Sequence, residues 1–443
     1  MNETTNEFYE NLFTPGTALS ELKFDGFCDW FVRLSDVSVH WEYQPSYVLS
    51  QCSYLLGGLI TFIHACNHGG RLPYLWLTTI LHGLAVESIS YIHPDIDNFW
   101  HSQTFLIFLG RRLPLHIIVL YPVFIYNSSI AAAKARLSKW SEPFAVGLLV
   151  VLIDIAYDIV SVNFLHWTWH DTDPNIYDRH YWVPWNSYYF HATFAASFTF
   201  WFHFTREVFC ESDGKWLADK RIVRELLSSF ITALLGPIGG ILMFLPLYHP
   251  LHDMYNIHSE VTYSVLFVVF LLIVWTGDRG ARSKFAGDSA NHKVSWATWL
   301  IVLHLVCHYA TFLYIVSFFN PEDEISTGLK EPLGPCDKYV PVQTVLGMTL
   351  RKRKYLCASD YDEGYFNWHC LPNEEPPRDY SIWYTACGTP LENRVELLTV
   401  TATICIIASV VFYNLHFASS GDNVFTKTNE GGRKATKNKK KIY

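Results

Sequence analysis

The chain has 443 residues, of which 50% are hydrophobic, 16% aromatic and only 17% charged. Because charged residues make up about a quarter of a typical soluble domain, this composition favours a membrane protein. The formal net charge is −8 and the basic residues form no stripe, which excludes a nucleic-acid-binding protein. Residues 1–44 carry no basic segment ahead of an apolar one, so we expect no cleavable signal peptide.

Long apolar stretches recur along the whole sequence. A helix of about 20 apolar residues crosses the hydrocarbon core of a bilayer. We therefore predict an all-α fold, a polytopic transmembrane helical bundle of about nine spans, with the lipid bilayer as its surroundings. The predicted spans are 47–66, 72–92, 113–133, 142–165, 184–207, 223–247, 258–276, 295–319 and 394–416.

The positive charges predict the orientation of these spans. Lys and Arg gather in alternate short connections and in the C-terminal tail, and such segments stay in the cytosol. The C-terminus is then cytosolic, and nine spans place the N-terminus in the lumen. Lys440 and Lys441, the fourth and third residues from the end, resemble the dilysine retrieval signal of endoplasmic reticulum membrane proteins. The alternative is a generic basic tail beside acidic lipid.

Orientation and cysteines together divide the chain into parts. An even set of four cysteines in a lumenal segment predicts two disulfides, with three possible pairings among Cys336, Cys357, Cys370 and Cys387. This segment could also act as a lid or bind a protein partner. The predicted parts are a lumenal N-terminal lead (1–46), an eight-span membrane bundle (47–319), a small lumenal disulfide-containing insert (320–393), a ninth span (394–416) and a basic cytosolic tail (417–443).

Acidic side chains inside the predicted spans are the strongest functional signal. Asp154 and Asp158 lie one helical turn apart in the span 142–165, and Glu87 lies in the span 72–92. Each carboxylate near the membrane centre costs about 2.5–3.5 kcal/mol, so such groups usually have an interior partner or a chemical task. The structural alternative is that they hydrogen-bond Tyr, Ser or Asn side chains of other helices.

The following span adds polar groups to the same leaflet. Asn186 and His191 enter the span 184–207 from its lumenal end, where Glu87, Asp154 and Asp158 also lie. No Lys or Arg is placed deep enough to pair with these acids. A carboxyl group in apolar surroundings is a candidate proton donor. We therefore predict these five residues as the catalytic set of a lumenal pocket.

The linker before that span has metal-ligand residue types. Carboxylates and imidazoles at short spacing can bind a divalent metal, although the Trp-rich context is also typical of an interfacial aromatic belt. His64 and His68, at the cytosolic end of the first span, are given no role. The candidate metal ligands are His166, His170, Asp171 and Asp173.

Several short motifs follow one another between residues 75 and 205. They are Glu87, Leu113-Pro114-Leu115, Asp154 with Asp158, Trp167-Thr168-Trp169 and Val183-Pro184-Trp185-Asn186. In this order they resemble the prokaryotic carotenoid-biosynthesis membrane family that includes carotenoid hydratases. The resemblance implies addition of water to a double bond of a long isoprenoid. The sequence departs from that pattern at Ile159, where the family has an Asp-Pro step, and the whole chain looks more like a eukaryotic multipass family of no established activity.

The leading functional hypothesis is therefore an endoplasmic reticulum enzyme that acts on a hydrophobic lipid or isoprenoid. A neutral carboxyl group, from Asp158 or Glu87, would protonate a double bond or polarise a head group. Asp154 would stabilise the cation or activate water, with Asn186 and His191 positioning it. The alternatives are a proton- or cation-coupled transporter or channel, and an accessory or chaperone membrane protein that uses the insert as its binding surface.

Overall fold

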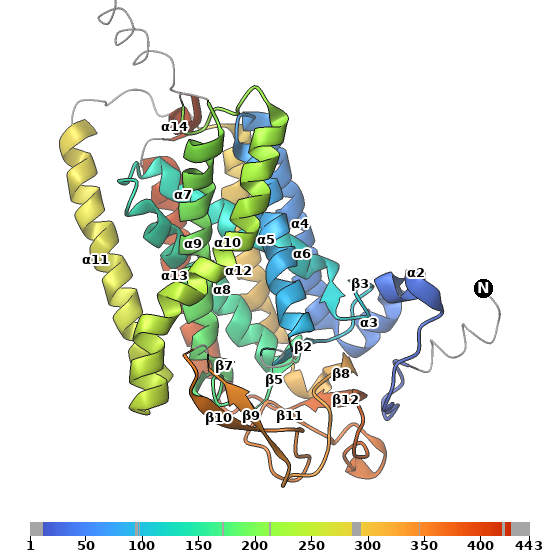
Figure 1. Ribbon diagram of the computed structural model, residues 1–443. Coiled ribbons are helices and arrows are strands. Elements are labelled where there is room, and N and C mark those ends of the chain that lie inside the picture. Colours follow the sequence, from blue (N-terminus) through green and yellow to red (C-terminus); the bar gives the residue numbers. More distant parts are fainter. Residues whose placement is uncertain are drawn as a thin grey trace, which may run out of the picture.

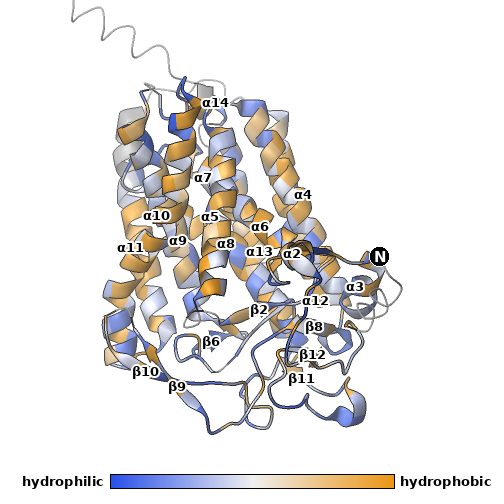
Figure 2. Ribbon diagram, turned by 45° about the vertical axis from the view of Figure 1, so that its right-hand side comes forward, coloured by the Kyte–Doolittle hydropathy of each residue, from blue (hydrophilic) through white to orange (hydrophobic). Residues whose placement is uncertain are grey.

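The computed structural model describes residues 12–426 apart from 94, 95, 97, 171, 212, 213, 286–293, 345, 419 and 420, and only the backbone of 279–285 and 418. Within this range, eight helical segments are long and apolar enough to cross a membrane. Apolar residues cover them, whereas polar residues gather toward the two ends of the molecule (Figure 2). The eight segments are Pro45–His68, Leu72–Ile92, Leu115–Lys134, Glu142–Asn163, Ile222–Met254, Ser259–Asp278, Trp296–Phe318 and Arg394–Phe417.

The helices begin and end close to the predicted span limits. Proline stands in the first turn of α4, α5 and α8, where its missing N–H costs no hydrogen bond. A π-helical turn, η1 (Pro122–Tyr126), joins α6 (Leu115–Tyr121) to α7 (Asn127–Lys134). The other long helices are α4 (Pro45–His68), α5 (Leu72–Ile92), α8 (Glu142–Asn163), α9 (Trp185–Phe209), α10 (Ile222–Tyr248), α11 (Ser259–Phe285), α12 (Trp296–Phe318) and α13 (Arg394–Tyr413).

Helix α9 is more polar than most of the long helices and is not among the eight apolar segments. It nevertheless has 25 residues, which gives a length of about 37 Å. It packs along α8 and α10, and α10 packs in turn on α5, whereas α12 packs between α4 and α13 (Figure 1). A helix surrounded by others can carry polar residues, because it faces neighbouring side chains more than lipid.

Small sheets at one end of the bundle correct the all-α prediction. The strands lie outside the spans and are two to six residues long, with side chains on alternate faces. The sheets have the orders β1-β3-β4, β2-β5, β6-β7, β10-β9 and β11-β12-β8. The strands are β1 (Val32–Leu34), β2 (Phe99–His101), β3 (Leu106–Phe108), β4 (Leu113–Pro114), β5 (Trp167–Trp169), β6 (Arg179–His180), β7 (Val183–Pro184), β8 (Ile325–Leu329), β9 (Tyr339–Gln343), β10 (Thr349–Arg353), β11 (Phe366–Asn367) and β12 (Trp383–Gly388).

Strands β8 to β12 form the insert, and they lie at the end of the bundle opposite to α14 (Asn423–Thr426) (Figure 1). We call these two ends the insert end and the tail end. Disulfides join Cys336 to Cys357 and Cys370 to Cys387, which selects one of the three possible pairings. The N-terminal lead belongs to the same layer, because Trp383 of β12 donates from Nε1 to the Leu12 carbonyl oxygen at 3.1 Å.

Buried polar contacts fix the insert to the loops of the bundle. The Ser46 backbone N–H, at the start of α4, donates to Glu324 Oε1 at 3.2 Å. The Thr172 hydroxyl donates to both carboxyl oxygens of Glu331, at 2.9 and 2.8 Å. His170 Nδ1 lies 3.3 Å from Glu363 Oε1. These contacts anchor the insert at several points, so it is a fixed cap.

The hairpin β9–β10 is a part of the insert that borders an internal cavity of the bundle. Val342 on β9 is buried, and it pairs with Leu350 on β10. At the turn, Leu346 and Met348 are 59% and 37% exposed. Arg351 on β10 stacks its guanidinium 3.8 Å from the ring centre of Tyr339. The hairpin therefore has an apolar tip beside basic strands.

The contribution of Glu324 and Glu331 to the stability of the cap should fall as pH rises from 5 to 7. Burial raises the pKa values of Glu324 and Glu331 from 4.5 to about 8. Between these values the folded cap holds protons that the unfolded chain has released, so these two groups lower the free energy of unfolding as pH rises. Burial also lowers the pKa of Lys330 to about 7, and it lowers the pKa values of His40, His166 and His170, so these groups have the opposite effect above pH 7 and below pH 6.5 respectively.

Thermal unfolding of wild type and of the double variant Glu324→Gln/Glu331→Gln in detergent at pH 5, 6 and 7 isolates the two glutamates. The variant should gain stability relative to wild type as pH rises, and a difference that does not change with pH would contradict the assignment.

Candidate functional site

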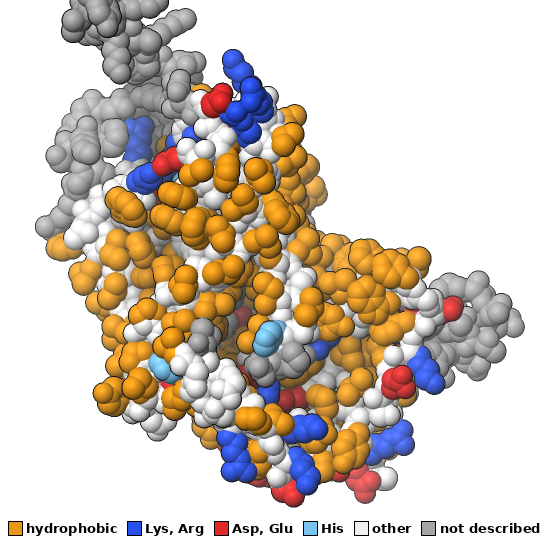
Figure 3. Space-filling model, viewed as in Figure 1, with side chains coloured by type: hydrophobic (Ala, Val, Ile, Leu, Met, Phe, Trp, Pro, Cys, Tyr) orange, Lys and Arg blue, Asp and Glu red, His pale blue; other side chains and the backbone are white. Residues whose placement is uncertain are grey.

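A cavity of about 390 Å³ lies inside the bundle next to the insert. Figure 3 shows this face hollowed between the helices and the insert, with acidic side chains visible there. Aromatic and aliphatic side chains form most of its wall, and Val342 to Thr344 of the hairpin stand at its edge. Its size and apolar lining are typical of a small-molecule site. The helical wall extends from the insert end to about the middle of the bundle: His82 to Ser90 of α5, Ile117 to Ile125 of α6 and η1, Val150 to Asp158 of α8, Asn186 to Ala195 of α9 and Ile241 to Tyr248 of α10.

All five residues predicted as the catalytic set line this one cavity: Glu87, Asp154, Asp158, Asn186 and His191. The geometry follows from two antiparallel neighbouring helices. Asp154 and Asp158 project from successive turns of α8, and Ser187 and His191 project from successive turns of α9. His191 Nε2 lies 3.5 Å from Asp154 Oδ1, and the Ser187 hydroxyl donates to Asp158 Oδ2 at 2.7 Å.

Burial and charge make this cluster unusual. The Asp154 side chain is 0% exposed, and its carboxyl group lies beside that of Asp158, with which it forms a hydrogen bond when one of the two holds a proton. The His191 side chain is 29% exposed and faces the cavity. None of the described residues that line the cavity is Lys or Arg. The negative charge of two carboxylates in this apolar site must therefore be balanced by protons or by a bound cation.

Glu87 occupies a second polar position in the wall. The Tyr121 hydroxyl donates to Glu87 Oε1 at 2.8 Å, and His101 Nε2 lies 4.0 Å from Oε2. Tyr121 lines the same cavity as Asp154. Arg112 lines a small neighbouring pocket together with Glu87, so a positive charge outside the cavity acts on this carboxyl group.

Asn186 holds the wall of the cavity in place. It is 2% exposed, and its amide nitrogen donates to the Asn175 carbonyl oxygen. This contact ties the loop before β6 to the first turn of α9. The side chain lines the cavity, but its donor is committed to the backbone, so it is a positioning residue.

The predicted metal ligands of the linker do not come together. His166 contacts Ser46 Oγ and Ser161 Oγ through its two ring nitrogens, at 2.9 and 3.0 Å. His170 pairs with Glu363, and Asp173 accepts from Asn98 and Asn175. Asp171 lies outside the described residues. Strand β5 separates the two histidines, and residues four apart on a strand stand about 13 Å apart rather than on one face of a helix.

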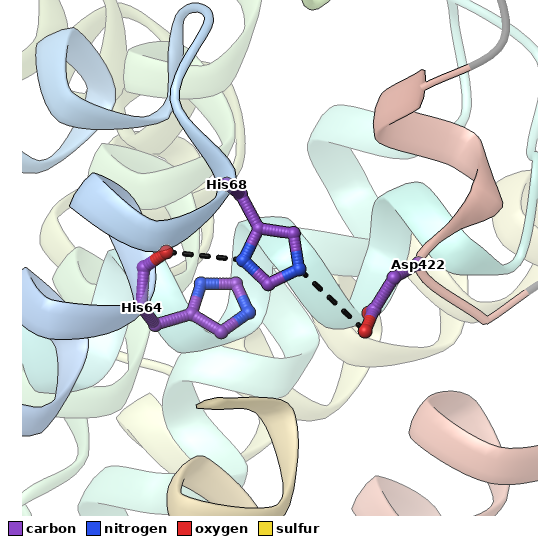
Figure 4. Close-up of side chains that lie close together, drawn as sticks. All are labelled: His64, His68 and Asp422. Carbon is purple, nitrogen blue, oxygen red and sulfur yellow. Dashed lines mark hydrogen bonds and ion pairs between the residues drawn. The ribbon is translucent and has the colours of Figure 1, made fainter. Parts of the chain in front are cut away.

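A different cluster of metal-ligand types lies at the tail end. His64 and His68 of α4 and Asp422, just before α14, offer ligand atoms within 4.8 Å of one another (Figure 4). Lys134 Nζ lies 2.8 Å from Asp422 Oδ1 and 3.0 Å from His416 Nδ1. Although burial raises the pKa of Asp422, contacts with His68 and Lys134 outweigh burial and hold it well below its usual range. The Lys134 ammonium supplies the positive charge, so this cluster anchors α14 to the bundle.

The fold and the cavity together define a polytopic helical membrane protein with a mostly apolar internal site. The chain belongs to the family described as a domain of unknown function, DUF7802, whose model matches residues 18–417. No curated protein and no solved structure matches the chain.

Proposed function

We propose that this protein is a membrane enzyme that acts on a hydrophobic lipid, with an isoprenoid chain as the leading substrate class. The supporting observation is the single cavity of about 390 Å³ in which Glu87, Asp154, Asp158 and His191 meet a largely apolar wall. An apolar wall suits a hydrocarbon chain, and the few polar groups suit one reacting bond. The resemblance to carotenoid hydratases suggests that this bond is a double bond and that water is added to it.

The geometry suggests separate acid and water positions. Glu87 would donate its proton to one carbon of the double bond, whose electron pair forms the new C–H bond and leaves a cation on the neighbouring carbon. A water molecule held by Asp154, Asp158 and His191 would add to that cation, and the proton it releases would restore Glu87. The aromatic rings of Phe124, Tyr157 and Trp167 line the cavity and could stabilise the cation through their π faces.

The position of the cavity favours an enzyme over the two alternatives. A transporter needs a polar path through both halves of the membrane, whereas the helical residues of this wall extend only from the insert end to about the middle of the bundle. An accessory or chaperone protein would not need buried carboxyl groups around a cavity. A protein partner on the insert is compatible with either role.

We also propose that α9 is a ninth span and that the insert lies in the lumen of the endoplasmic reticulum. Helix α9 connects the insert end of α8 to the tail end of α10, so it runs the same distance as its neighbours. Two disulfides at the insert end fit an oxidising lumen. Lys440 and Lys441 lie outside the described residues, so the proposal that they act as an endoplasmic reticulum retrieval signal rests on the sequence alone. Protease accessibility of the tail in sealed microsomes measures this orientation.

The experiment compares the lipids of cells that lack the protein with those of cells that express wild type or Glu87→Gln. Loss of the protein should accumulate an unsaturated lipid and deplete a species heavier by one water. Wild type should restore the balance and Glu87→Gln should not, because the amide cannot supply the proton. Mass spectrometry of total lipid and isoprenoid extracts is the measurement.

Glu207→Gln is the matched control, because Glu207 is a half-exposed residue of α9 that pairs with Lys139 outside the cavity. It should restore the lipid balance as wild type does. Expression level and thermal unfolding of each variant show whether it is folded. A folded Glu87→Gln protein that rescues fully would contradict the proposed function, as would lipid profiles that do not depend on the protein at all.

A further inference from the structure

We propose that Asp154, Asp158 and His191 bind one divalent transition-metal ion at the wall of the cavity. The site differs from the set His166, His170 and Asp173 and is made by two helices of the bundle. It deepens the proposed function, on which the chemical role of the ion rests. The binding itself can be measured without any substrate.

The distances suit a first-row metal ion. Carboxylate oxygen and imidazole nitrogen bind such ions at about 2.0–2.2 Å, which places neighbouring ligand atoms of a tetrahedral site about 3.4 Å apart. His191 Nε2 and Asp154 Oδ1 are 3.5 Å apart. One atom each of Asp154, Asp158 and His191 lies within 4.8 Å of the others, so a small rotation of Asp158 completes the set. Two ligands one turn apart on a helix, with a third from the adjacent helix, form a rigid frame.

Charge balance favours a divalent cation in particular. Two ionised carboxylates and a neutral imidazole carry a charge of −2, which a divalent ion cancels. A neutral site is the form that an apolar cavity tolerates best. The tail-end cluster differs at this point, because Lys134 already lies 2.8 Å from Asp422 and would repel an ion. Of the two clusters, the cavity cluster is therefore the metal site.

The surroundings hold the ligands in position. The Ser187 hydroxyl donates to Asp158 Oδ2 at 2.7 Å and leaves Oδ1 for an ion. The ring of Phe124 meets the His191 ring edge to face, with centroids 5.6 Å apart. Asp154 is fully buried beside Asp158, and two ionised carboxylates this close repel each other unless a proton or a cation balances their charge. Contacts that orient the ligands in this way are typical of metal sites.

His191 is the partly exposed member, so the open side of the site faces the cavity. A bound metal ion supplies a water molecule whose pKa falls to about 7 and which is then a strong nucleophile at neutral pH. Asp154, Asp158 and His191 would place this water beside the substrate. Glu87 belongs to another helix and hydrogen-bonds Tyr121, so it stays available as the proton donor.

The test measures metal content in the full-length protein purified in detergent. Chelator-treated protein is loaded separately with Zn²⁺, Mn²⁺ or Fe²⁺ and dialysed, and the bound metal is counted by mass spectrometry. Wild type should retain about one equivalent of at least one ion. Asp154→Asn and His191→Gln should each lower its affinity by about 10- to 100-fold or more.

His68→Gln and His203→Gln are matched controls, because the first removes a ligand of the tail-end cluster and the second changes a histidine of α9 outside the cavity. Both should bind the ion as wild type does. Metal that survives Asp154→Asn and His191→Gln in folded protein, or that is lost in His68→Gln instead, would overturn the assignment. So would a wild type that binds none of the three ions.

The same variants separate this inference from the proposed function. Glu87→Gln should keep its metal while losing lipid conversion. If lipid conversion depends on Glu87 and Asp154 but no ion binds, the metal site fails and the enzyme stands. If the ion binds but no lipid changes, the metal site stands and the proposed function fails.

Discussion

Asp154→Asn should lower lipid conversion by about 10²- to 10⁴-fold without destabilising the fold. The substitution keeps the size of the side chain but removes the carboxylate that faces His191 at 3.5 Å. Because Asp154 is fully buried beside Asp158, a neutral amide removes one of two adjacent acidic groups and lowers the cost of burial. We therefore expect activity to fall while the unfolding temperature stays the same or rises. A packing role predicts the reverse, namely lower stability with activity retained.

The measurement is conversion of the accumulated lipid by purified protein in vesicles, with thermal unfolding recorded on the same samples. Asp337→Asn, an exposed position on the insert, is the control for a loss of one carboxylate. It should match wild type in both assays. If a folded Asp154→Asn protein converts the lipid as fast as wild type, Asp154 has no role in the reaction.

Arg71→Met should lower the free energy of unfolding by about 3–5 kcal/mol, because it leaves a buried carboxylate uncompensated. Arg71 Nε donates to Glu225 Oε2 at 3.0 Å, and both side chains are 0% exposed. The Arg71 guanidinium also donates to the Phe202 carbonyl oxygen at 3.1 Å and lies 4.0 Å from the centre of its ring. This one side chain therefore links the tail ends of α5, α9 and α10.

The double variant Arg71→Met/Glu225→Leu should recover much of the lost stability, since replacing a whole buried pair by apolar residues is often neutral. Lys139→Met is the control: Lys139 and Glu207 form a pair at 56% and 49% exposure, and its loss should cost less than about 1 kcal/mol. Chemical denaturation in detergent measures the free energy of unfolding of wild type and of the three variants. A loss at Arg71 no larger than that at Lys139 would show that the buried pair does not hold the helices together.

The sequence predicts the helices well because the bilayer sets their length. The predicted span 72–92 coincides with α5 (Leu72–Ile92), and 142–165 differs from α8 (Glu142–Asn163) only at its last two residues. Strands are missed because they are two to six residues long and depend on partners far along the chain. Strand β5, for example, pairs with β2, whose residues lie 66 to 70 positions earlier, a contact that no local pattern encodes.

The cavity residues could be predicted because buried acids in an apolar helix are costly and stand out. The positions of these residues relative to one another could not be predicted, because they depend on α8 and α9 being antiparallel neighbours. The metal hypothesis placed its ligands in the linker, since a spacing of four residues suits a helix and the structure has a strand there. The tail-end cluster was missed because Asp422 lies in a segment that reads as a polar tail, and only the fold brings it to Lys134.

The hairpin β9–β10 has a consequence for how the protein meets its substrate. Its exposed tip residues Leu346 and Met348 are apolar, and Val342 to Thr344 border the cavity. Such a tip can dip into the outer part of a leaflet, with Arg351 and Lys354 near phosphate groups. Ligand would then arrive by lateral diffusion in two dimensions. Saturation would follow the mole fraction of that lipid in the bilayer, and dilution of the vesicles in buffer would leave the rate per protein unchanged.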